Sequence, residues 1–174
     1  MKKLFLTNLI FGLFTIYCFG QNESTESKLM DCIYDNRPGY KEVLYSYEQL
    51  LISENILTDK SGISYIILLE RIRDDNQFNY CPSKSYIDES LKLMTPDVDS
   101  IRNCQLKLLE KSNEQNSKVN EMINAINDLT ITGSLNPSNI ANEILNILTE
   151  NEFEHYYYRA KFIFLLDIIC RNKN

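Results

Sequence analysis

The stretch FIFLLDIIC, residues 162–170, decides the fold class of this chain. Asp167 is its only charged residue, and apolar side chains fall on nearly every side of a helix drawn through it. A helix that is apolar all round is a buried helix, and this run is shorter than the about 20 residues that a membrane-spanning helix needs. We therefore expect a largely buried C-terminal helix with the other elements packed around it.

The residues just before this run, TENEFEHYYYRAK, indicate where the helix begins. Thr149 and Glu152 have the T-x-x-E spacing of a capping box, in which a threonine hydroxyl and a glutamate side chain satisfy free backbone amides at a helix start. This spacing predicts that the stretch forms the first turns of the C-terminal helix.

Three consecutive tyrosines follow the only histidine of the chain, and these four residues form our candidate binding surface: His155, Tyr156, Tyr157 and Tyr158. Residues adjacent on a helix point about 100° apart, so the three phenols cannot all face one core and at least one should reach the surface. In one interpretation the tyrosines bury their rings and hydrate their hydroxyls at the margin of the core. In the other they form an exposed patch that binds a partner protein, peptide or glycan.

The rest of the chain reads as helices separated by turns, with few strand patterns. Apolar residues follow the helical i, i+3, i+4, i+7 spacing in several segments, and start signals stand at Thr95 with Pro96 and at Asn136 with Pro137. We expect residues 21–174 to form a single all-α domain, a compact bundle of about six to seven helices. The helical segments are residues 24–34, 40–51, 65–72, 101–129 (one long helix, or two with a kink) and 140–147, and the C-terminal helix.

The N-terminal sequence MKKLFLTNLIFGLFTIYCFG, residues 1–20, predicts a secretory signal peptide. Two lysines precede an apolar run, and Cys18 and Gly20 are small residues at the −3 and −1 positions of a cut before Gln21. An uncleaved anchor is the alternative, and lipid attachment is disfavoured because Tyr17 stands where a small residue is needed. We expect an exported protein, periplasmic or extracellular.

Charge excludes one class of partner. The full chain has 18 basic and 24 acidic residues, and removal of the signal peptide with its two lysines leaves a formal charge of −8. A chain of this charge lacks the basic surface that nucleic-acid binding requires.

Four cysteines remain after Gln21, and an even set in an exported protein predicts two disulfides. Zinc is disfavoured because structural zinc sites bring their ligands in close pairs such as C-x₂-C, and we expect neither a metal nor a cofactor. Four cysteines allow three connectivities. Cys81 with Cys104 and Cys32 with Cys170 is our preferred pairing, since the second bridge would tie the first helix to the last.

Catalytic motifs are missing from the sequence. Glu152 and His155 form one E-x-x-H, but the helical di-iron site needs two such motifs and the zincin site needs a second histidine. No glycine-rich phosphate loop and no G-x-S-x-G occur. A pair of carboxylates for hydrolysis stays possible, because 24 acidic residues provide many pairs.

Two classes of function follow. The first is a non-catalytic exported protein that binds a partner, such as an inhibitor or immunity-type module of the cell envelope that blocks a basic enzyme. The second is a cell-envelope hydrolase that uses paired carboxylates. We favour the first because catalytic signatures are missing; a carboxyl group in an apolar pocket of an acidic cleft would favour the second.

Overall fold

The computed structural model describes residues 24–75, 79–93, 98–111, 118–134 and 136–173. The signal peptide predicted for residues 1–20 and the N-cap predicted at Thr95 lie outside these ranges.

The described residues are all-helical, as predicted, and contain no strand. They form eight α-helices and one short 3₁₀ helix: α2 (Thr25–Asn36), α3 (Tyr40–Ser53), α4 (Gly62–Asp74), α5 (Tyr86–Leu91), α6 (Val98–Lys111), α7 (Lys118–Ile131), α8 (Pro137–Ile147), η1 (Glu152–Glu154) and α9 (Tyr156–Lys173). The bundle therefore has one helix more than the expected six to seven.

The additional helix is α5, in a segment where the sequence pattern predicted a connection. Ser85 caps it, because its hydroxyl oxygen accepts a hydrogen bond from the backbone N–H of Asp88 at 3.1 Å. The S-x-x-D spacing and the acidic first turn are ordinary helix-start signals. The helix has only six residues, a length at which hydrophobic periodicity is hard to recognise.

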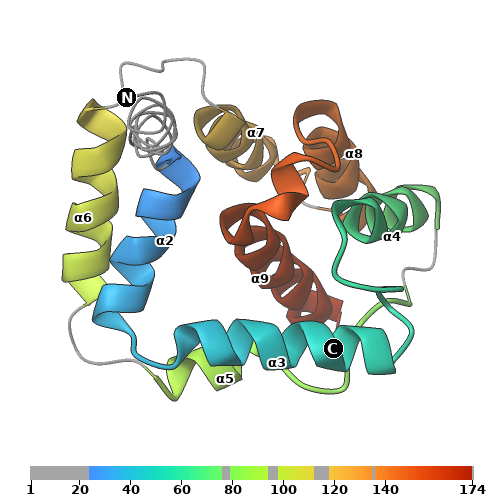
Figure 1. Ribbon diagram of the computed structural model, residues 1–174. Helices are drawn as coiled ribbons and strands as arrows, with labels where there is room; N and C mark the ends of the chain where they lie inside the picture. Colours follow the sequence, from blue (N-terminus) through green and yellow to red (C-terminus); the bar gives the residue numbers. More distant parts are fainter. Residues whose placement is uncertain (1–23, 76–78, 94–97, 112–117, 135, 174) are drawn as a thin grey trace, which may run out of the picture.

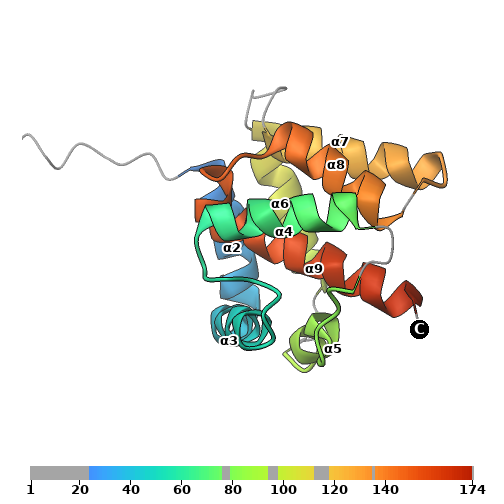
Figure 2. The same cartoon turned by 90° about the vertical axis from the view of Figure 1, so that its right-hand side faces the viewer.

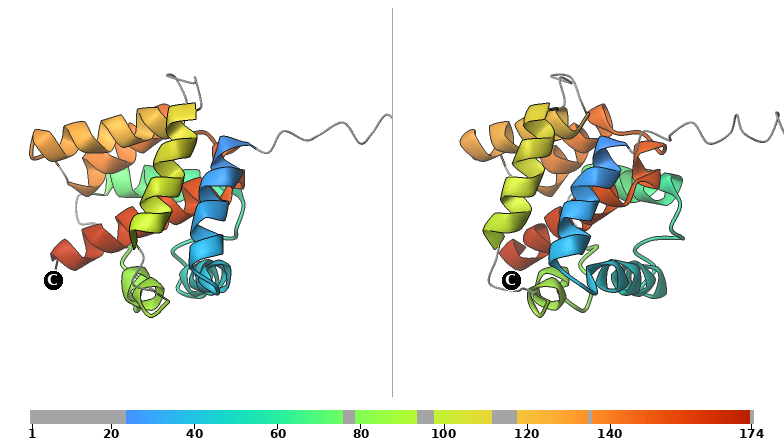
Figure 3. Two further views of the ribbon diagram at one scale, coloured as in Figure 1. Left: turned by 90° about the vertical axis from the view of Figure 1, so that its left-hand side faces the viewer. Right: turned by 60° about the vertical axis from the view of Figure 1, so that its left-hand side comes forward.

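Helix α9 runs through the centre of the bundle (Figure 1). Helices α4, α7 and α8 stack on one side of it, and α3 and α5 lie on the opposite side (Figure 2). A third flank is covered by α2, with α6 beside it (Figure 3). The prediction of a largely buried C-terminal helix is confirmed, since α9 contributes these buried residues: Tyr157, Tyr158, Arg159, Ala160, Phe162, Ile163, Leu166, Asp167 and Cys170.

Residues 101–129 form two helices, which was one of the two forms expected. Helix α6 packs against α2, whereas α7 packs against α8. Each buries its apolar face on a different partner, so one continuous helix would leave one of these faces exposed.

Two disulfides crosslink the bundle, but their predicted connectivity is wrong. The bridges join Cys32 to Cys104 and Cys81 to Cys170, with Cα–Cα distances of 5.8 and 5.5 Å. Packing of α2 on α6 brings the first pair together, and the second joins the segment before α5 to the end of α9. The prediction assumed a bridge between the first and last helices, but Cys32 of α2 is bonded to α6 and Cys170 of α9 to the segment before α5. Two bridges fit an oxidising compartment.

Removal of either bridge should destabilise the protein to a similar extent. The bridges close loops with sequence separations of 72 and 89 residues, and the chain-entropy relation gives about 4.5 kcal/mol for each, with a difference of only about 0.2 kcal/mol. Chemical denaturation of Cys32→Ala/Cys104→Ala and Cys81→Ala/Cys170→Ala measures this directly. Peptide mapping without reductant checks the pairing, and a fragment joining Cys32 to Cys170 would contradict the structure.

Candidate functional site

A hollow of about 230 Å³ lies where α2 meets the beginning of α9. We call it the acidic hollow. Three of the four residues of the candidate binding surface line it, although Tyr158 does not. Its lining is Glu26, Ser27, Met30, Asp31, Tyr34, Glu154, His155, Tyr156 and Tyr157.

The acidic hollow contains three carboxylates and no lysine or arginine. The Glu26 carboxylate accepts a hydrogen bond from the Tyr158 hydroxyl at 2.9 Å. Glu154 accepts from the backbone N–H of Gly62 at 2.9 Å. Asp31 is exposed and has no hydrogen-bond or ion-pair partner among the described residues. The hollow therefore presents negative charge that the described part of the chain does not neutralise in full.

Tyr34 forms part of its wall and has an unpaired hydroxyl. The hydroxyl oxygen is buried and has no hydrogen-bond partner within the described structure. Burial is the main reason that the pKa of Tyr34 rises to about 12, and the phenols of Tyr156 and Tyr40 and the Asp31 carboxylate add to this effect. The phenol is therefore neutral at physiological pH, with an oxygen that is free to accept a hydrogen bond.

The four candidate residues divide between core and surface. Tyr157 and Tyr158 are 3% and 1% exposed, so both rings are buried, and the Tyr158 hydroxyl donates to Glu26. Tyr156 is 39% exposed, and His155 is exposed beside it. The exposed part of the candidate surface thus consists of His155 and Tyr156.

Helix α9 begins at Tyr156, and residues 149–155 do not form its first turns. The predicted helix start at Thr149 is therefore wrong. The backbone N–H and the hydroxyl of Thr149 both donate to the Glu152 carboxylate at 2.7 Å, which completes only half of a capping box. The 3₁₀ helix η1 follows, and extended backbone at His155 (φ −85°, ψ 129°) separates it from α9. This corner turns the Glu154 side chain toward α4 and leaves His155 at the surface.

A buried arginine holds this corner in place. Arg159 is 7% exposed, and its Nε donates a hydrogen bond to the Phe153 carbonyl oxygen at 2.5 Å. Its terminal nitrogens lie 3.4 Å from the Glu154 carboxylate and 3.5 Å from the Glu48 carboxylate. One guanidinium therefore connects η1 and α9 to α3.

Glu48 is fully buried, and its negative charge is balanced by two cations. Arg159 lies on one side, and Lys60 Nζ lies 3.7 Å from Glu48 Oε2 on the other. The Tyr65 hydroxyl donates to Glu48 Oε1 at 2.6 Å. Burial and then the Glu48 charge raise the pKa of Tyr65 well above its usual value, which keeps this donor protonated. This network joins α3, α4 and α9 beneath the acidic hollow.

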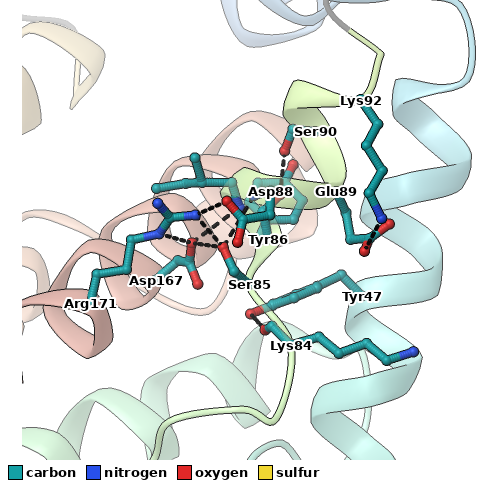
Figure 4. A network of polar contacts seen from close by, with 11 residues as sticks. Tyr47, Lys84, Ser85, Tyr86, Asp88, Glu89, Ser90, Lys92, Asp167 and Arg171 are labelled. Carbon is teal, nitrogen blue, oxygen red and sulfur yellow. Dashed lines mark hydrogen bonds and ion pairs between the residues drawn. The ribbon is translucent and has the colours of Figure 1, made fainter. Parts of the chain in front are cut away.

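Asp167 is the second buried carboxylate of the described residues, and it fixes α5 (Figure 4). It accepts hydrogen bonds from the Ser85 hydroxyl at 2.8 Å and from the Ile87 N–H at 3.0 Å. Arg171 lies 3.3 Å from Asp167 and also contacts Asp88. Neither Asp167 nor Glu48 lines the acidic hollow, and both buried carboxylates have structural partners.

Sequence reasoning missed the residues that α2 contributes. Glu26, Met30 and Tyr34 are spaced by four residues and share one helical face, which was a detectable signal. Their meeting with the beginning of α9 depends on tertiary packing. The same holds for Glu48 and Arg159, which are 111 positions apart and therefore show no local pattern.

Within the described ranges no three histidine, cysteine, aspartate or glutamate side chains are grouped to hold a metal ion. No helix in that part of the chain has the length and apolar character needed to cross a membrane. Comparisons with protein-family models, with curated proteins and with solved structures found no match.

Gly62 begins α4 and packs directly on the chain before η1. A Cβ at this position would lie 1.9 Å from the Glu150 carbonyl oxygen, a contact that only backbone movement can relieve. We expect Gly62→Ala to lower the free energy of unfolding by about 3 kcal/mol, the upper end of the usual cost of overpacking. Gly133→Ala is the control, because a Cβ there meets nothing within 4 Å and only its positive φ of 67° is strained, which costs about 1 kcal/mol. Equal losses in urea denaturation would contradict this close approach.

The contributions of Arg159 and Glu48 to the free energy of unfolding should depend on each other. Removing one partner of a buried ion pair costs about 3 to 5 kcal/mol because the other charge is left buried. Arg159→Met and Glu48→Gln should each show a loss of this size, and the double variant should lose less than their sum by at least about 1 kcal/mol. Arg73→Met is the control, because its ion pair with Asp74 is exposed and its loss should hardly change stability. Strictly additive losses would show that the two groups do not interact.

Proposed function

We propose that the protein is an exported, non-catalytic binding module and that the acidic hollow receives a basic side chain of a protein partner. The observation that carries this proposal is the lining of the hollow: three carboxylates, an unpaired Tyr34 hydroxyl and exposed Tyr156, with no lysine or arginine. A lysine or arginine side chain has the donors and the charge that this lining lacks.

The geometry of individual groups supports a cationic guest. A guanidinium or ammonium can donate to Asp31, which has no polar partner among the described residues, and to the buried Tyr34 oxygen. The Tyr156 ring is 39% exposed, and the Arg159 guanidinium already lies 5.4 Å from its centre, so this ring is placed to interact with cations. Arginine and tyrosine are among the residues enriched at energetic hot spots of interfaces.

Size and charge support a protein partner over a polymeric substrate. A hollow of about 230 Å³ has room for a single side chain, whereas a polymeric substrate needs a longer groove. The formal charge of −8 expected for residues 21–174 would accelerate the approach of a basic partner. An inhibitor or immunity-type module that blocks a basic enzyme of the cell envelope fits these features.

The hydrolase alternative has less support from the geometry. It calls for a carboxyl group held in an apolar pocket. In the acidic hollow Asp31 and Glu154 are exposed, and the half-buried Glu26 is hydrogen-bonded to Tyr158. The two buried carboxylates, Glu48 and Asp167, lie elsewhere.

Site-specific photocrosslinking in the native host tests the proposal. A benzoylphenylalanine placed at position 156 should crosslink a protein of net positive charge, and the same group at exposed position 45 should not. Asp31→Asn/Tyr156→Ala should weaken binding of the crosslinked partner at least about tenfold, equivalent to about 1.4 kcal/mol. Asp128→Asn/Tyr45→Ala makes the same chemical changes at exposed positions and should leave affinity unchanged.

Two outcomes would contradict the proposal. Equal weakening by both double variants would show that overall charge, not the hollow, governs binding. Release of sugar or peptide fragments from purified cell wall by the wild-type protein, and loss of this activity in Asp31→Asn, would favour the hydrolase.

A further inference from the structure

A second hollow of about 180 Å³ lies between α2, α6 and α9, and we call it the cationic hollow. Met30 and Tyr157 line it as well as the acidic hollow, so these two side chains separate the two spaces. Its lining is Met30, Ile33, Arg37, Tyr40, Ile101, Gln105, Tyr157, Ala160, Lys161 and Phe164.

The cationic hollow has the opposite charge to its neighbour. Arg37 and Lys161 line it, and no aspartate or glutamate does. Neither cation has a carboxylate partner among the described residues, and Lys161 Nζ lies 5.5 Å from the centre of the Tyr157 ring. Two uncompensated cations in one hollow are notable in a chain with an excess of acidic residues.

The charged form of Lys161 is disfavoured in this position. Burial lowers its pKa below the ordinary value, because the charged form has lost part of its hydration. An anion in the hollow would restore a favourable interaction for the ammonium group, and ligand binding and the protonation of Lys161 would then strengthen each other.

The remaining walls are mainly apolar. Ile33 and Ile101 are buried, and Phe164 is 44% exposed, which is unusual for a large apolar side chain of a central helix. Apolar walls with a few polar groups that fix orientation are typical of small-molecule sites. The small volume excludes a long acyl chain and favours a compact ring or a short chain.

We propose that the cationic hollow binds a small organic monoanion, a carboxylate attached to a compact apolar group. The carboxylate contacts Lys161 and Arg37, and the apolar group lies against Ile33, Ile101 and Phe164. This site is separate from the acidic hollow and does not depend on the proposed function.

Calorimetric titration of the purified exported chain with benzoate and hexanoate tests this site. Both should bind saturably, whereas benzyl alcohol and hexanol, which lack the charge, and acetate, which lacks the apolar group, should bind at least tenfold more weakly. The pKa of Lys161, followed by NMR of its side chain, should rise when benzoate is bound. Alcohols that bind as tightly as the carboxylates would overturn the proposal.

Variants locate the binding. Lys161→Met and Arg37→Met should each weaken benzoate binding at least fivefold, and both proteins should keep the wild-type circular dichroism spectrum. Lys107→Met and Arg102→Met remove exposed cations of α6 and should leave binding unchanged. Since Arg37 lies after the end of α2 and is partly exposed, its variant tests the site even if Lys161→Met is unstable. Equal weakening by the control variants, or no binding of either carboxylate at millimolar concentration, would refute the proposal.

Discussion

The buried Arg159 guanidinium is the interaction on which the surrounding structure depends. It is the point at which η1 and α9 meet α3, and its partner Glu48 extends the contact to α4 through Tyr65. Desolvation makes such a cluster costly unless nearly every polar group is paired. The requirement for pairing fixes the corner before α9, and this corner leaves His155 and Tyr156 exposed at the acidic hollow while Tyr157 and Tyr158 are buried.

Local patterns predicted those parts of the fold that local physics determines. The apolar run at residues 162–170 indicated a buried central helix, and Asn136 with Pro137 indicated the start of α8, where the Asn136 side chain accepts from the Asn139 N–H at 2.8 Å. The signal at Thr149 was of the same local kind, but it failed because the Glu154 contacts with α4 and Arg159 turn the chain before a helix can continue.

The candidate site could be predicted only on its α9 side. Periodicity required one of three adjacent tyrosines to face outward, but it did not identify Tyr156 or indicate that α2 would supply Asp31 and Tyr34 opposite it. The net charge of the chain likewise did not indicate where the candidate site lies. Packing of α2 on α9 produces an acidic and a cationic space that share the Met30 and Tyr157 side chains, and an overall count averages the two.

The disulfide connectivity has a consequence for how the protein matures. In chain order the bridged cysteines are 32, 81, 104 and 170, and each native bridge skips the bridged cysteine that comes next. If the chain is exported from its N-terminal end, as we propose, Cys81 arrives before Cys104, and oxidation in order of arrival would join Cys32 to the wrong partner. The native pairing is then reached by thiol–disulfide exchange. Efficient maturation along this route calls for a disulfide isomerase in addition to an oxidant.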